Sequence, residues 1–333
     1  MDRDVTTALP DPAGLTLIRE APIPVAVVTG FLGSGKTTLI RALLRDPALE
    51  GTAVIVNEFG EIGLDHVLVE AAEEDTILLE GGCLCCASHG DLVRALRSLL
   101  DRRERAELPA YRRVILETSG LADPAPILQT LMRDPLRLSR YKPASLTTTV
   151  DCLLGLETFQ RHGEAERQIA FADQVLITKT DLADKKRLVA TRDAVRTLSA
   201  APISIAPPGP GQGIGLFQTL SESIRLDVTP APHHHGSYTT VARILDRALP
   251  WSRVEGWLGE AVERCGGGLL RLKAIIAVEG EDRPVAIHAV QHVIHRPEYL
   301  PPSPDRSRQG RITVIGQGIE RAVLDRLLDD LAV

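Results

Sequence analysis

The sequence predicts an α/β protein: a doubly wound, mostly parallel sheet, followed by a second, smaller α+β domain. Short apolar runs rich in Val and Ile alternate with helix-like segments over the first 200 residues, as in strands buried on both faces of a parallel sheet. One of these runs leads directly into a glycine-rich loop, Gly30 to Thr37, and then into a helical pattern. After residue 200 the composition changes, which predicts a domain boundary.

The first domain is expected to span residues 23–228, after a flexible lead-in of residues 1–22 that contains three prolines and no periodicity. Helical patterns cover segments such as 38–44 and 91–105. The predicted strands are Val25–Val28, Ala53–Val56, Thr76–Leu79, Val114–Leu116, Leu146–Val150 and Gln174–Ile177. Because strands and helices alternate along the chain, we expect parallel pairing.

A linker rich in His and Pro is predicted over residues 229–237, and the α+β domain over 238–333. In this second domain a strand is expected from Tyr238 and helices over Pro250–Arg264 and Glu320–Leu331. Three further strands are predicted, over Leu269–Val278, Pro284–His295 and Arg311–Ile315.

Composition excludes several classes of partner. The chain has 38 Lys and Arg residues against 44 Asp and Glu residues, so it has no excess of positive charge to attract nucleic acid or an anionic membrane. Its amino end is acidic, and no apolar run reaches the roughly 18 residues of a membrane span. Three of the five cysteines lie within four positions, unlike the dispersed pairs of a secreted disulfide protein. We therefore expect a cytoplasmic protein.

The segment from Gly30 to Thr37 matches the G-x-x-x-x-G-K-[ST] pattern of a phosphate-binding loop (P-loop). Its glycines let backbone N–H groups turn toward phosphate oxygens, which a Cβ would obstruct. Lys36 is expected to reach the β- and γ-phosphates and Thr37 to ligate Mg²⁺. The predicted nucleotide-binding residues of this loop are Gly30, Gly33, Ser34, Gly35, Lys36, Thr37 and Thr38.

Glu117 follows the strand Val114–Leu116, where a nucleotide-hydrolysing protein keeps an acidic residue aimed at the magnesium shell. We expect Glu117 to hold Mg²⁺ through water and to form the catalytic set with Lys36 and Thr37. Gly120 would let the backbone approach the γ-phosphate, which makes this segment a candidate switch. The alternative is a carboxylate at an ordinary strand end.

Thr178, Lys179 and Asp181 follow the strand Gln174–Ile177 and are predicted to bind the nucleotide base. A carboxylate at Asp181 can accept hydrogen bonds from N1–H and N2–H of guanine, whereas adenine presents a lone pair at N1. The sequence thus favours GTP over ATP. The common guanine motif has Asn where this chain has Thr178, which weakens the base assignment.

Cys83, Cys85 and Cys86 offer three thiolates after two glycines, a set that suits Zn²⁺ or Cu⁺. The fourth ligand could be water, His89, Glu58, Glu61 or a group from another protein. Glu58 and Glu61 could equally touch Mg²⁺ or the attacking water, or be solvated loop acids. A redox-active thiol pair and buried structural cysteines are the alternatives for the cluster.

The remaining histidines are ambiguous. His233, His234 and His235 could capture metal or form a solvated turn. Counting by twos along the predicted strand puts His288 and His292 on one face and His295 on the other, so these three do not form one metal tripod.

The sequence resembles CobW-type GTPases, which are relatives of the GTPases that insert nickel into urease and hydrogenase. Five motifs carry the resemblance, in the same order along the chain: the P-loop, Asn57 to Gly60, the Cys83-x-Cys85-Cys86 cluster, Glu117 to Gly120 and Thr178 to Asp181. The segment from Leu270 to His292 resembles the CobW carboxyl-terminal domain.

This resemblance implies a GTPase, using GTP with Mg²⁺ and releasing GDP, that delivers a transition metal to a metalloenzyme client. Zinc is the metal expected most often, and cobalt occurs for some members. The chain lacks the long His-rich linker of some relatives. No arginine finger or catalytic glutamine is recognisable, so turnover should be slow, and a partner or a second copy in a homodimer could supply the missing group.

Two other classes compete. A small-molecule kinase would use the same loop to transfer phosphate to an acceptor, with the cysteines incidental. A redox-sensing regulator would oxidise its thiols over a static nucleotide.

Overall fold

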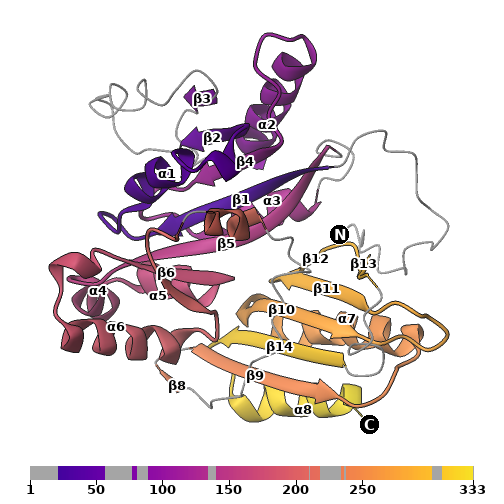
Figure 1. The fold of residues 1–333 in the computed structure, drawn as a ribbon. Helices are drawn as coiled ribbons and strands as arrows, with labels where there is room; N and C mark the ends of the chain where they lie inside the picture. Colours follow the sequence, from indigo (N-terminus) through magenta and orange to yellow (C-terminus); the bar gives the residue numbers. More distant parts are fainter. Residues whose placement is uncertain are drawn as a thin grey trace. The chain divides into compact units, whose positions relative to one another are not determined.

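The computed structural model describes residues 22–56, 77–80, 89–133, 140–209, 211–217, 234–235, 238–301 and 310–332 (Figure 1). Contacts divide the chain into two compact units, one of residues 21–219 and one that contains residues 220–333. The division lies ahead of the predicted linker, 229–237. Each unit is described by itself.

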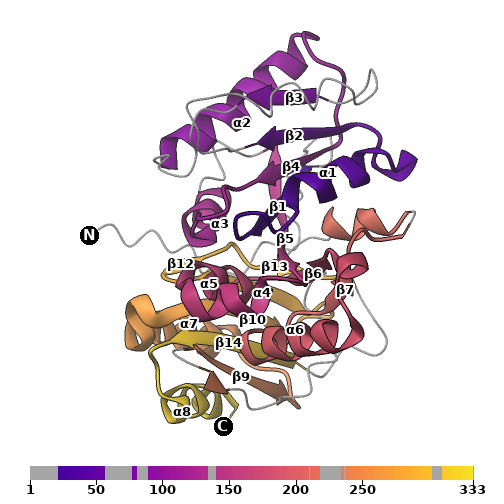
Figure 2. The same ribbon diagram turned by 90° about the vertical axis from the view of Figure 1, so that its left-hand side faces the viewer.

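The first unit is built on a seven-stranded sheet in the order β3-β2-β4-β1-β5-β6-β7, in which every pairing is parallel. Figure 2 shows this order from β3 to β5. The strands are β1 (Ile23–Gly30), β2 (Thr52–Val56), β3 (Ile77–Glu80), β4 (Arg113–Glu117), β5 (Tyr141–Asp151), β6 (Gln174–Thr178) and β7 (Ile203–Ile205). The predicted parallel sheet is therefore confirmed, with β7 as an added edge strand.

Helices connect these strands. They are α1 (Lys36–Leu44), α2 (His89–Glu104), α3 (Pro124–Arg133), α4 (Gly155–Arg161), α5 (Gly163–Ala170) and α6 (Lys185–Leu198), with short 3₁₀ turns at Pro47–Leu49, Thr180–Leu182 and Gln212–Phe217. Four successive residues of β1, from Val25 to Val28, are fully buried although they point alternately to opposite faces. Both faces of the sheet are therefore covered. Ala26 and Val28 pack with Leu39 and Ile40 of α1.

The second unit contains an antiparallel sheet in the order β12-β11-β10-β14-β9-β8, with β13 paired to β11. The strands are β8 (His234–His235), β9 (Tyr238–Leu245), β10 (Leu269–Ile276), β11 (Val285–Val290), β12 (Val293–Ile294), β13 (Glu298–Tyr299) and β14 (Gly310–Gln317). Helices α7 (Trp251–Cys265) and α8 (Arg321–Ala332) share one apolar core with this sheet, through residues such as Leu258, Leu272 and Leu328. The predicted α+β architecture is confirmed.

The prediction of one strand over Pro284–His295 was wrong, because the chain reverses at Gln291 and His292. Gln291 has φ 54°, and Val290 pairs with Val293 across the reversal. Residues that flank a two-residue hairpin loop, such as Val290 and Val293, are three apart yet lie on the same face, so counting by twos across the loop assigns the wrong face. The prediction that His295 lies on the face opposite His288 was therefore wrong, because the register places these two residues opposite each other. His292 thus lies in the turn, and the backbone N–H of His295 donates to the carbonyl of His288 at 2.8 Å. Among the described residues, no helix is long and apolar enough to span a membrane.

Candidate functional site

The P-loop joins β1 to α1 at the carboxyl edge of the parallel sheet. Gly35 immediately precedes α1 with φ 90°, a left-handed conformation that favours glycine. Lys36 is the first residue of α1 and is buried; its Nζ donates to the carbonyl of Gly30 at 2.9 Å and to that of Phe31 at 3.3 Å. The loop thus folds around the amine that the sequence assigns to phosphate.

Thr37 and Glu117 meet although they lie 80 residues apart, the Thr37 Oγ1 donating to the Glu117 Oε1 at 2.8 Å. Thr37 lies in the first turn of α1, and Glu117 is the last residue of β4, with 3% of its surface exposed. A hydroxyl and a carboxylate oxygen are hard ligands of the kind that Mg²⁺ prefers. This donor set fits a magnesium ion held between P-loop and β4.

The segment after β4 lies directly against the P-loop. The Thr118 N–H donates to the carbonyl of Val28 at 3.0 Å, and the Thr118 Oγ1 donates to the Thr29 Oγ1 at 2.8 Å. A Cβ added to Gly120 would lie 2.6 Å from the backbone nitrogen of Leu32, closer than real Cβ contacts come. Position 120 therefore requires glycine for close approach of two backbones.

Thr178, at the end of β6, holds the P-loop from the other side. Its Oγ1 donates to the carbonyl of Ser34 at 2.7 Å, while the Ser34 Oγ and Thr149 Oγ1 are 2.6 Å apart. The departure from the common Asn at this position thus supplies a hydroxyl that anchors the loop. Asp181 lies in the 3₁₀ turn Thr180–Leu182 and is exposed.

Sequence reasoning did not single out Asp151, the last residue of β5. Its carboxylate forms an ion pair with the Nζ of Lys179 at 2.7 Å and accepts from the backbone N–H of Leu153 at 2.7 Å. The signal was available, since Asp151 directly follows an apolar strand at the same sheet edge as Glu117. This pair fixes Lys179, which has φ 55°.

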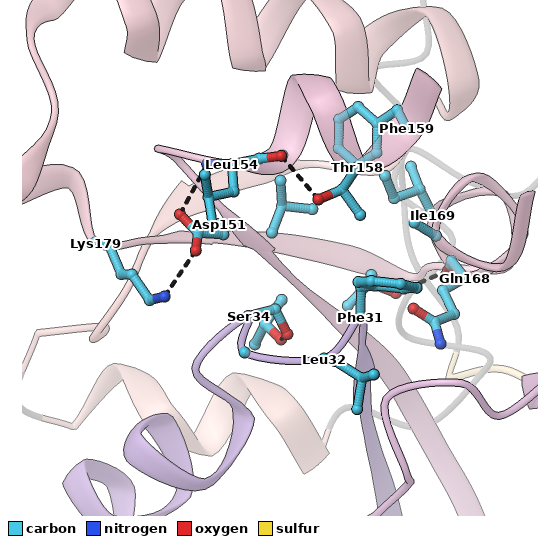
Figure 3. A pocket seen from close by; sticks show the side chains of 16 residues that line it. Phe31, Leu32, Ser34, Asp151, Leu154, Thr158, Phe159, Gln168, Ile169 and Lys179 are labelled. Atoms are coloured by element: carbon cyan, nitrogen blue, oxygen red, sulfur yellow. Dashed lines mark hydrogen bonds and ion pairs between the residues drawn. The ribbon is translucent and has the colours of Figure 1, made fainter. Parts of the chain in front are cut away.

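A pocket of about 190 Å³ lies beside the P-loop, lined by residues 31–34, the end of β5 and parts of α4 and α5. In Figure 3 the Asp151–Lys179 pair lies at one end and Phe31, Gln168 and Ile169 at the other. The Phe31 ring also packs on His162, with ring centroids 4.6 Å apart. Gln168 was not predicted, because a glutamine within a helix carries no motif.

The predicted soft-metal residues Cys83, Cys85, Cys86, Glu58 and Glu61 lie outside the described residues, as does His233. Among the residues that the structure does describe, no three His, Cys, Asp or Glu side chains gather in a way that could hold a metal ion. Cys152 and Cys265 are buried, and burial raises the pKa of each thiol. Both therefore stay protonated at neutral pH, unlike the thiolates that bind metals.

Family comparisons match both units. Residues 24–203 match the model described as CobW/HypB/UreG, nucleotide-binding domain, and residues 238–332 match the cobalamin synthesis protein CobW carboxyl-terminal domain. The chain belongs to the CobW family. The nucleotide-binding match spans the P-loop, Glu117 and Asp181, and the predicted resemblance is confirmed.

Members of the CobW family resemble this chain over most of its length. This chain is 31% identical to the zinc chaperone YjiA of Escherichia coli, over an alignment that covers 82% of this chain and 87% of that protein. It is 28% identical to the zinc chaperone CobW of Pseudomonas aeruginosa, covering 93% and 92%. The crystal structure of Zn(II)-bound YjiA GTPase from E. coli superposes with a TM-score of 0.69 at 26% identity, covering 94% of this chain and 99% of that one.

Proposed function

We propose that this protein hydrolyses GTP with Mg²⁺ and uses the nucleotide state to control a transition metal, zinc, that it delivers to a metalloenzyme client in the cytoplasm. The observation that carries the GTPase half is the contact of Thr37 with Glu117 beside the buried Lys36. In this proposal Lys36 neutralises the phosphates, Thr37 and Glu117 hold Mg²⁺, and Asp181 recognises guanine. Relatives named as a GTPase and as zinc chaperones support it.

The metal half is supported by the position of the cysteines in the chain. Cys83 follows β3 by three residues, and β3 runs parallel to β4 and β1. Carboxyl ends of parallel strands meet at one edge of a sheet, so β3 ends at the same edge as β1 and β4, which lead to the P-loop and to Glu117. We assign Cys83, Cys85 and Cys86 to zinc, with Co²⁺ as the alternative metal and Glu58 or Glu61 as a fourth ligand.

The proposal predicts that metal affinity differs between the GTP and GDP forms, by a coupling of about 1–3 kcal/mol, because a useful switch needs that range. Zinc and cobalt affinities should be measured by chelator competition with GDP and with a non-hydrolysable GTP analogue. The Cys83/Cys85/Cys86→Ser triple variant should lose the tight site, whereas Cys152→Ala should retain it. Equal affinities in both nucleotide states would end the metal-switch hypothesis.

Phosphate release is the complementary measurement. Wild-type protein should release phosphate from GTP with no acceptor present, and much more slowly from ATP. A requirement for an acceptor would instead indicate a kinase.

A further inference from the structure

Gln168 on α5 contacts the segment that follows β4. The side chain is fully buried, and its Nε2 donates to the carbonyl of Gly120 at 3.0 Å and to that of Ala122 at 3.1 Å. Two carbonyl partners fix the orientation of the amide, since only the nitrogen can donate. Both of its N–H groups are therefore directed to one short stretch of backbone.

The oxygen of the same amide lacks a comparable hydrogen bond in the part of the chain that the structure describes. The Gln168 Oε1 is buried and, among the described residues, receives no hydrogen bond. Leaving a buried acceptor unsatisfied is unfavourable, and a methionine of similar volume would avoid it. The fold thus retains a glutamine at a position where packing alone favours an apolar residue. The two bonds to Gly120 and Ala122 are the feature that this residue adds.

The stretch that Gln168 holds is the one that approaches the P-loop. Gly120 lies against the backbone of Leu32, and the next contact of α5 is the ion pair of Arg167 with Asp123 at 2.9 Å. On the far side, the Thr118 N–H is bonded to Val28 of β1. The backbone at Gly120 is thus fixed between β1 and α5, and Gln168 supplies the fixing point nearest to Gly120.

We propose that Gln168 is a positioning residue for GTP hydrolysis: it holds the backbone at Gly120 where that backbone can meet the γ-phosphate. This inference rests on the proposed GTPase function. GDP has no γ-phosphate, so the contact stabilises the transition state most, the GTP complex less and the GDP complex not at all. Loss of the two bonds should lower kcat while GDP affinity is retained.

The test uses three variants of the full chain. Gln168→Glu keeps the shape but replaces the donor NH2 group with one acceptor oxygen, which repels the carbonyls of Gly120 and Ala122. Gln168→Met keeps the volume without donors and serves if the glutamate variant does not fold. Gln160→Glu makes the same chemical change on the exposed face of α4 and is the matched control.

For Gln168→Glu and Gln168→Met we expect kcat to fall by at least about tenfold, because small misplacements near the reacting atoms are costly. The Kd for GDP should stay within about twofold, whereas the non-hydrolysable GTP analogue should bind more weakly. Gln160→Glu should match wild type. An unchanged kcat in both Gln168 variants, or a parallel loss of GDP affinity and thermal stability, would overturn the proposal. Absence of phosphate release by wild type would instead overturn the GTPase function itself.

Discussion

The two sheets of this protein organise polar residues differently. In the parallel sheet, every strand ends at the same edge, and buried polar side chains collect there, among them Glu117, Asp151 and Thr178. In the antiparallel sheet neighbouring strands run in opposite directions, so successive strand ends are divided between two edges. One sheet therefore concentrates chemistry at one edge, and the described part of the other is organised around an apolar core shared with α7 and α8.

The largest effect is expected for Lys36→Ala, at the edge of the parallel sheet. The variant removes the cation that neutralises phosphate oxygens during transfer, so GTP hydrolysis should fall by at least about a hundredfold, the scale of losing one electrostatic contact to a transition state. Single-turnover phosphate release measures it. Zinc binding by chelator competition should survive, since the assigned thiols are untouched. A variant that retained most of the wild-type rate would remove Lys36 from the site.

A smaller effect is expected for Asp181→Asn, on the same edge. An amide cannot accept hydrogen bonds from both N1–H and N2–H of guanine, so GTP should bind more weakly and xanthosine triphosphate relatively better. The preference should change by about 10–100-fold, as for loss of one or two hydrogen bonds to a charged group. Competition binding with GTP, ATP and xanthosine triphosphate measures it. An unchanged preference would show that Asp181 does not recognise the base.

The contrast between the sheets also explains which residues of the candidate site could be predicted from the sequence. Sequence predicted Lys36 and Thr37 from the P-loop pattern, and Glu117 and Thr178 because each directly follows an apolar run. Parallel topology then brings such positions together. Once these strands are adjacent and parallel, the residues that follow them lie together at one edge of the sheet.

Other features left no such signal. Gln168 acts on main-chain carbonyls, which every residue type provides, and it lies within a helix whose pattern is set by burial. The hairpin at Gln291 and His292 uses neither Asn-Gly nor Asp-Gly, the dipeptides that would have indicated a reversal. Both features depend on the main chain, whose hydrogen bonds and turns leave little trace in the residue types, and this holds in the nucleotide unit and in the antiparallel unit.

The smallest effect on activity is expected for Trp257→Phe, in the second unit. Trp257 is buried on α7, and its Nε1 donates to the carbonyl of Leu327 on α8 at 2.6 Å. Losing this hydrogen bond and part of the ring volume should lower the free energy of unfolding of that unit by about 1–3 kcal/mol. The kcat for GTP hydrolysis should stay within about twofold, because Trp257 belongs to the core of the second unit and, among the residues described, shares no partner with those assigned to the nucleotide site.

Trp251→Phe is the matched control, since the Trp251 Nε1 is buried and, within the described residues, has no hydrogen-bond partner. It should cost less stability than Trp257→Phe, because no bond is lost. The chain has two tryptophans, so in each variant the remaining one reports urea unfolding of the second unit by fluorescence. A large fall in kcat for Trp257→Phe with unchanged stability would break the contrast, because it would place part of the chemistry on the antiparallel unit.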